Sequence, residues 1–196
     1  KADDPIPEPH VKKTILVGVL LVTAGGVTYL GLSGRQTVPL SQLGTVSQVV
    51  NTTTLSVTYS RPVARGRTLF GPDGVVPYGS FWNPGANDAT WLEFSKDVLV
   101  AGYPVAAGKY SLWARPGVDS WDISLSRDWD VFHIPYPGED GDFIRFSLPV
   151  DDGEHVEVMT FAFDELGPNT TVLSFRWGNT RIAFPVEVEM ELPPAG

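Results

Sequence analysis

The chain has 196 residues, of which 42% are hydrophobic, a formal net charge of −9 at pH 7 and no cysteine. This length suits one ordinary domain with a short additional segment, and ten Phe, six Tyr and six Trp supply enough core material to exclude collagen-like and low-complexity chains. The absence of Cys excludes disulfides, thiolate metal sites and a cysteine nucleophile. The acidic balance argues against a nucleic-acid partner, which would need clustered Lys and Arg.

An apolar segment without a single charged side chain occupies residues 14–32. A helix of this length spans roughly 28 Å, which matches the hydrocarbon thickness of a bilayer, so we expect one transmembrane helix over this range. A cleaved signal peptide is the alternative, but its apolar core usually has only about 7–15 residues and no A-x-A cleavage site follows here. Thr14, Gly18 and Gly25 share one face of the predicted helix, where small residues would let another membrane helix approach closely.

The charges beside this segment predict its orientation. Lys12 and Lys13 precede the apolar segment, whereas Arg35 alone follows it. The positive-inside rule then places residues 1–13 in the cytoplasm as a tail and the larger C-terminal part in the periplasm. We therefore expect a single-pass protein of the bacterial inner (cytoplasmic) membrane, in contact with the lipid bilayer.

Residues 33–43 are expected to be a linker, and residues 44–196 to form one extracytoplasmic domain. Apolar and polar residues alternate here as in half-buried strands; Leu55, Val57 and Tyr59, for example, fall on one face. Strands are expected at residues 52–59, 90–94, 97–100, 109–114, 121–125, 142–148, 155–163, 171–177 and 181–188. Turn-rich segments separate them, so the fold class is all-β: an antiparallel β-sandwich or jelly-roll-like domain, preceded by the one transmembrane helix.

Residues 61–89 are too long for a hairpin connection and contain four prolines. We expect them to form a structured excursion over one end or edge of the sandwich. The excursion starts with the cationic segment RPVARGR at residues 61–67, which is unusual in an acidic chain. Its arginines could bind an anion or an acidic partner through their planar guanidinium groups. They could also pin the excursion to the sandwich through backbone carbonyls and carboxylates, and we favour this structural role.

The sequence presents no catalytic constellation. A Ser–His–acid triad needs a His that can reach a serine, but neither His133 nor His155 lies in a nucleophile-elbow context and G-x-S-x-G is absent. Two acidic runs, at residues 139–142 and 151–154, do not fit the EF-hand spacing and are interpreted as solvated turns. We therefore expect no enzymatic activity, no metal and no cofactor.

The tryptophans divide into core and surface candidates. Trp113, Trp121 and Trp177 lie in alternating strands and are expected in the core. Trp129 stands between two aspartates in a loop and is the best candidate for an exposed contact with a partner. Aromatic rings can also stack on sugars, so a membrane-tethered envelope glycan-binding module is the alternative function.

Several ordered motifs resemble an exported bacterial family that is classified only as a domain of unknown function. They are VTYSRPVARGRTLFG at residues 57–71, VPYGSFW at 76–82, GANDAT at 85–90, AAGKYSLW at 106–113 and WGNTRIAFP at 177–185. The resemblance covers roughly residues 46–186 and implies a β-sandwich with no established chemistry. We take its motif residues as structural; they are Arg61, Pro62, Gly66, Arg67, Trp82, Gly85 and Asn87. The family usually has W-R-x-G-A-N, whereas Asn83 and Pro84 follow Trp82 here, so a ligand bound by that Arg is expected to be lost.

The anchored architecture is also similar to that of an accessory subunit that helps hold a bacterial photosynthetic reaction centre within its antenna ring. This resemblance implies that the partners are reaction-centre and antenna polypeptides. It also implies that the subunit acts through its contact surface with these partners and need not bind pigment. We therefore expect a non-catalytic, single-pass accessory or scaffolding subunit of a bacterial membrane complex, which docks its sandwich on the periplasmic side.

Overall fold

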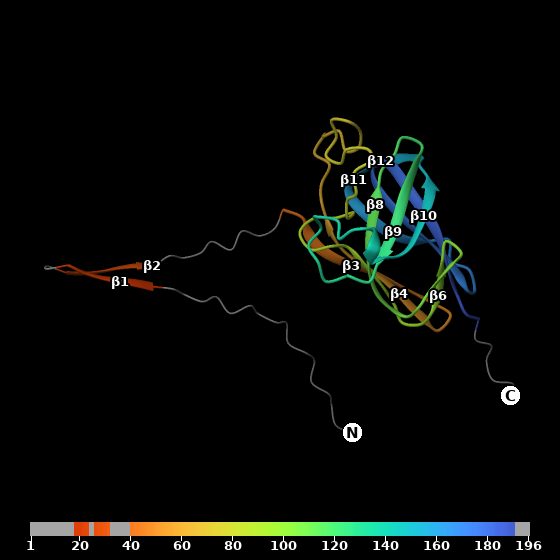
Figure 1. The fold of residues 1–196 in the computed structure, drawn as a ribbon, viewed down its shortest axis with the longest axis horizontal. Helices are drawn as coiled ribbons and strands as arrows, with labels where there is room; N and C mark the ends of the chain where they lie inside the picture. The colour runs from red at the N-terminus through yellow and green to blue at the C-terminus, as the bar shows by residue number, and fades with distance from the viewer. Residues whose placement is uncertain (1–17, 24–25, 32–39, 191–196) are drawn as a thin grey trace, which may run out of the picture. The chain divides into compact units, whose positions relative to one another are not determined.

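The computed structural model describes residues 18–23, 26–31 and 40–190 (Figure 1). The chain divides into two compact units, Lys1–Val38 and Pro39–Gly196. In the first unit, strand β1 (Gly18–Thr23) pairs antiparallel with strand β2 (Gly26–Gly31).

The predicted transmembrane helix falls on this first unit. Residues 14–17, 24–25 and 32 lie outside the described residues, as do the predicted tail at 1–13 and the packing positions Thr14 and Gly25, whereas Gly18 begins β1. In the part of the chain that the structure describes, no helix has both the length and the apolar character needed to cross a membrane. The membrane helix and its packing face therefore stay predictions, neither confirmed nor excluded.

The second unit is all-β, as predicted, and its strands form two antiparallel sheets (Figure 1). The six-stranded sheet has the order β10-β9-β8-β5-β4-β3 and consists of β3 (Gln42–Val50), β4 (Thr53–Arg61), β5 (Trp91–Phe94), β8 (Gly108–Arg115), β9 (Ser120–Ser126) and β10 (Asp142–Pro149). The four-stranded sheet has the order β11-β12-β6-β7 and consists of β6 (Val98–Val100), β7 (Tyr103–Val105), β11 (Asp151–Asp164) and β12 (Thr170–Val188). Neighbours in the larger sheet follow the chain order apart from the β6–β7 hairpin. This meander fits the sandwich form of the prediction better than the Greek keys of a jelly roll.

Most strands lie within a few residues of their predicted positions, with three differences. Strands β3 and β7 were not expected, and β3 begins at Gln42, inside the range predicted as a linker. The two strands expected at 171–177 and 181–188 are one strand, β12, because Gly178 takes a φ of 60° and the strand continues through it. The second acidic run lies in β11, whereas the first forms a 3₁₀ turn, η1 (Glu139–Gly141).

The core lies between the two sheets, and the predicted inward faces are confirmed. Leu55, Val57 and Tyr59 of β4 are all buried. The Tyr59 hydroxyl reaches the opposite sheet, where it accepts a hydrogen bond of 3.1 Å from the backbone N–H of Phe161. Trp121 and Trp177 are buried in this core as expected. Trp113 is also buried, but on the other face of β8, where it packs edge-on against Tyr136.

The long excursion after β4 is structured, as predicted, and Figure 1 shows its yellow loops at one end of the domain. Phe70 packs edge-on against Trp82, Trp121 and Trp177, with ring centroids 5.9, 4.7 and 6.0 Å away. Leu69 and Val76 of the excursion are also buried. The excursion therefore closes this end of the core with its own apolar side chains.

Candidate functional site

Motif residues from two separate stretches of the excursion meet at one pocket. Pro62, Arg67, Trp82 and Gly85 contribute to the lining of this pocket, which has a volume of about 420 Å³ and is termed the motif pocket below. Gly66 lines an adjacent hollow together with Arg67. The remaining motif residues do not line the pocket: Asn87 lies behind it, and Arg61 packs over the backbone of Gly44.

The first stretch reaches the pocket because it pairs with β11. The backbone N–H of Ala64 donates to the carbonyl of Glu157 at 2.8 Å, and the N–H of Met159 donates to the carbonyl of Pro62 at 2.9 Å. The Glu157 carboxylate also accepts the backbone N–H of Arg65 at 2.7 Å. Arg65 takes a φ of 54° and the glycine after it a φ of 65°, which turns the chain away from β11.

Arg67 is exposed, yet its guanidinium stabilises this turn. Nε donates to the carbonyl of Ala64 at 2.9 Å, and Nη2 donates to the carbonyl of Val63 at 2.7 Å. Both acceptors lie in the excursion itself, so these bonds stabilise a local turn, and the expected pinning of the excursion to the sandwich by Arg67 stays a prediction. Because a guanidinium has five N–H donors, the Nη1 hydrogens and one Nη2 hydrogen are not used by these bonds.

The second stretch is held by Asn83, the residue that follows Trp82. Its side chain is fully buried. Nδ2 donates to the carbonyls of Leu112 at 2.7 Å and Thr90 at 3.3 Å, while Oδ1 accepts the backbone N–H of Thr90 at 2.6 Å. In this chain the position therefore fixes the loop to the sheet and contributes no charge to the pocket.

Asn87 positions a histidine that the motifs do not contain. The backbone carbonyl of Asn87 accepts hydrogen bonds from His133 N at 3.1 Å and from His133 Nδ1 at 2.7 Å. Since a carbonyl can only accept, Nδ1 carries the proton. His133 lines the motif pocket, and this bond leaves its Nε2 unused. No local sequence signal marks this histidine as a pocket residue, because it lies 46 residues beyond Asn87 in the chain.

The second histidine is exposed on β11. His155 Nε2 lies 3.1 Å from Glu157 Oε2, and this hydrogen bond raises the pKa of His155 above its ordinary value. The same bond, followed by the backbone N–H of Arg65, lowers the pKa of Glu157. The pair therefore lies directly behind the turn that carries Arg65.

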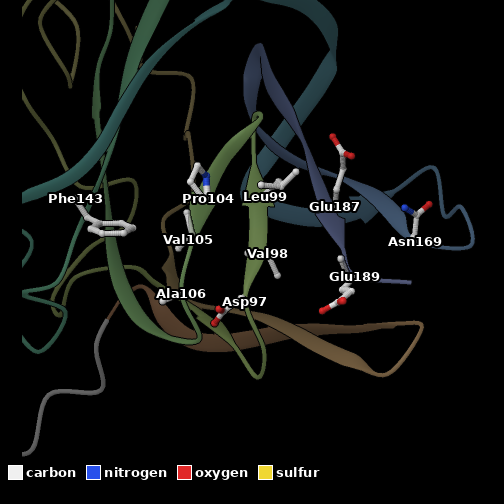
Figure 2. Close-up of a pocket in the computed structure, with 11 residues that line it drawn as sticks. Asp97, Val98, Leu99, Pro104, Val105, Ala106, Phe143, Asn169, Glu187 and Glu189 are labelled. Carbon is white, nitrogen blue, oxygen red and sulfur yellow. The ribbon is translucent and has the colours of Figure 1, made fainter. Parts of the chain in front are cut away.

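A larger hollow of about 640 Å³ lies over the β6–β7 hairpin and is termed the β6–β7 groove below (Figure 2). Apolar side chains cover much of its lining; they include Val98, Leu99, Pro104, Val105, Phe143 and Val188. The carboxylates of Asp97, Glu187 and Glu189 also belong to it, and Figure 2 shows the last two on the neighbouring strand β12 and just after it. No sequence motif indicated this groove, because its lining comes from four separate parts of the chain: the β6–β7 hairpin, Phe143, Asn169 and residues 187–189.

Trp129 is half-buried, in contrast to the expected exposed ring. It meets Trp91 edge-on at 5.7 Å between centroids. Lys109 Nζ lies 4.4 Å from the Trp129 ring centroid and 4.8 Å from that of Trp91, which is a cation–π arrangement. Its role as a partner contact stays a prediction.

The first acidic run joins a polar network beside β9. Asp142 Oδ2 accepts hydrogen bonds from Ser124 at 2.8 Å, Tyr136 at 2.6 Å and Arg145 Nη2 at 2.6 Å. Burial, followed by the bond to Asp142, raises the pKa of Tyr136 to about 12. Across the described ranges, no group of three or more His, Cys, Asp or Glu side chains is placed to hold a metal ion.

Comparison with known proteins gives one match. Residues 41–186 match the model of the family described as "Protein of unknown function (DUF2911)", which confirms the resemblance to a family without assigned function. No curated protein and no solved structure matches the chain. The similarity to a photosynthetic accessory subunit gains no support from these comparisons.

Proposed function

The chain belongs to this family, and because the family carries no assigned activity, we propose a function from the surfaces of the domain itself. The protein is a non-catalytic accessory or scaffolding subunit of a bacterial membrane complex, anchored by residues 14–32 and docking its sandwich on the periplasmic side. The observation that carries this proposal is the β6–β7 groove. Its occupant is a polypeptide segment of a partner subunit that combines apolar side chains with Lys or Arg.

The chemistry of the groove supports such an occupant. Leu99 is apolar, yet 39% of its surface is exposed. A partner segment in the groove would bury Leu99 together with the apolar residues beside it. Three carboxylates lie around this apolar surface, so a cationic segment would be attracted and oriented. One Asp97 oxygen already accepts the N–H of Ala107 at 2.8 Å, which leaves the other for a partner.

The edge of the sheet favours side-chain contacts over strand addition. Strand β7 is the edge strand of its sheet, and Pro104 lies at its centre, opposite Leu99. Proline offers no N–H and blunts an edge strand against pairing with another chain. The partner segment would therefore lie across the groove without joining the sheet.

The predicted anchor adds to this docking through effective concentration. A membrane helix and a docked domain in one chain reinforce each other, so each contact can be weak alone. A reaction centre–antenna complex is the partner we propose to test first, and only the sequence resemblance supports that choice. The bilayer is the second partner, through the anchor.

The glycan-binding alternative needs an open aromatic platform. Trp82, Trp113, Trp121 and Trp177 are buried. The other two tryptophans, Trp91 and Trp129, meet edge-on beneath Lys109. No specific observation on the described surface therefore favours glycan binding over docking.

The test compares two variants of the full chain, each expressed in its native host and purified in mild detergent. Leu99→Glu places a like charge in the groove, and we expect it to reduce co-purification with the membrane complex by about tenfold, which corresponds to about 1.4 kcal/mol. Val118→Glu is the matched control, because Val118 is 69% exposed and lies outside the groove. Retention of Leu99→Glu at the wild-type level, or loss of both variants together, would contradict docking through the groove.

A further inference from the structure

The motif pocket has a charge pattern that the docking role does not use. Its lining contains Arg65, Arg67 and His133 and no Asp or Glu. The chain as a whole has 23 acidic and 14 basic residues, so this local balance is opposite to that of the protein. Glu157, the carboxylate nearest this turn, is bound to the backbone N–H of Arg65 and to His155 and does not line the pocket.

The guanidinium of Arg67 is oriented by its bonds to the excursion. Nε and one Nη2 hydrogen donate to the carbonyls of Ala64 and Val63, which fixes the plane of the group. The edge formed by Nη1 and the second Nη2 hydrogen is left, and two parallel N–H donors match the planar geometry of a carboxylate. A fixed guanidinium loses less side-chain entropy when it binds than a free one does.

Apart from Ser41, the rest of the pocket is lined by apolar and aromatic residues and Gly85. Trp82 and Trp177 both line it and stack on each other, with ring centroids 6.2 Å apart and an interplanar angle of 20°. The indole Nε1 of Trp177 is buried and has no hydrogen-bond partner among the described residues. Leu40 and Ile134 lie at the pocket with 80% and 53% of their surface exposed. A ligand with an apolar body would cover the exposed surface of Leu40 and Ile134.

From these observations we infer that the motif pocket binds a small organic carboxylate with an apolar or planar body. The carboxylate lies against Arg67 and Arg65, and the body lies against the exposed side chains of Leu40 and Ile134, with only the edges of the two buried indoles beneath it. His133 Nε2, which its bond to Asn87 leaves unused, contributes a third polar contact. The volume of about 420 Å³ falls within the usual range of small-molecule sites, about 300–1,000 Å³.

The test uses the full chain in mild detergent and three probes of the same size class: benzoate, its neutral analogue benzamide, and phenyl phosphate. Binding is followed by isothermal titration and by the change in tryptophan fluorescence. We expect saturable binding of benzoate and at least about tenfold weaker binding of benzamide, because the neutral amide gains no charge-assisted hydrogen bonds. Tighter binding of phenyl phosphate than of benzoate would overturn the carboxylate assignment.

Three arginine variants distinguish binding by the pocket arginines from a general electrostatic effect of losing one positive charge. Arg65→Gln removes a charge while its backbone bond to Glu157 remains possible, and we expect about fivefold weaker benzoate binding. Arg67→Lys keeps the charge but loses the planar edge and the two bonds to Ala64 and Val63, so we expect similarly weaker binding together with a lower melting temperature. Arg61→Gln is the matched control, because Arg61 lies outside the pocket. Equal effects of Arg65→Gln and Arg61→Gln, equal binding of benzamide, or no saturable binding would overturn the proposal. No partner complex is present, so these results are independent of the docking proposal.

Discussion

Replacing Asn83 with Ala tests whether this buried side chain holds the loop in place. The substitution removes three hydrogen bonds at a fully buried side chain, two to carbonyls and one from the N–H of Thr90. The Thr90 N–H would be left buried without its acceptor, at a cost of about 1–3 kcal/mol, and each lost bond to a carbonyl adds about 1 kcal/mol. We therefore expect the free energy of unfolding to fall by about 3–5 kcal/mol.

The assay is guanidinium unfolding followed by circular dichroism, with thermal melting as the second measurement. For a domain of this size, such a loss lowers Tm by roughly 6–20 °C. Asn179→Ala is the matched control, because Asn179 is exposed and donates one hydrogen bond of 3.2 Å to the carbonyl of Gly153; we expect less than about 1 kcal/mol there. Equal losses in the two variants would refute the view that Asn83 braces the loop.

Two further predictions concern the same end of the domain. Gly85→Ala should lower the free energy of unfolding by about 1–3 kcal/mol in the same assay, because an added Cβ would lie 2.7 Å from the Thr90 hydroxyl. Gly153→Ala is the control and should cost less, because its Cβ would meet nothing closer than 3.7 Å. Equal effects of the two substitutions would contradict the steric argument. An NMR titration should place the pKa of His155 above its ordinary value, because its ring is hydrogen-bonded to Glu157, and the pKa should return toward the ordinary value in Glu157→Gln. Because the folded-state pKa is raised, the stabilising contribution of His155 is complete below the unfolded-state pKa and is lost as pH rises through the folded-state pKa; an unshifted wild-type titration would show that the pair does not form.

The sequence by itself determined which residues enter the core of most strands. A side-chain period of two assigns Leu55, Val57 and Tyr59 to one face wherever β4 finds a partner, because alternate residues of any strand point to opposite sides. The same local rule correctly placed Trp121 of β9 in the core. It failed for β3, whose exposed outer face includes Leu43, because an edge strand needs no apolar alternation once a neighbour supplies its hydrogen bonds.

Only the tertiary structure decided where the candidate sites lie. The continuity of β12 through Gly178 depends on pairing with β11, since the same residues read in isolation resemble a turn. Arg67 and His133 line one pocket because strand pairing and the bond to Asn87 bring their loops together. The β6–β7 groove likewise needs β12 beside the hairpin. Contacts between residues far apart in the chain leave no periodic signal in either segment, so these surfaces emerge only when the sheets assemble.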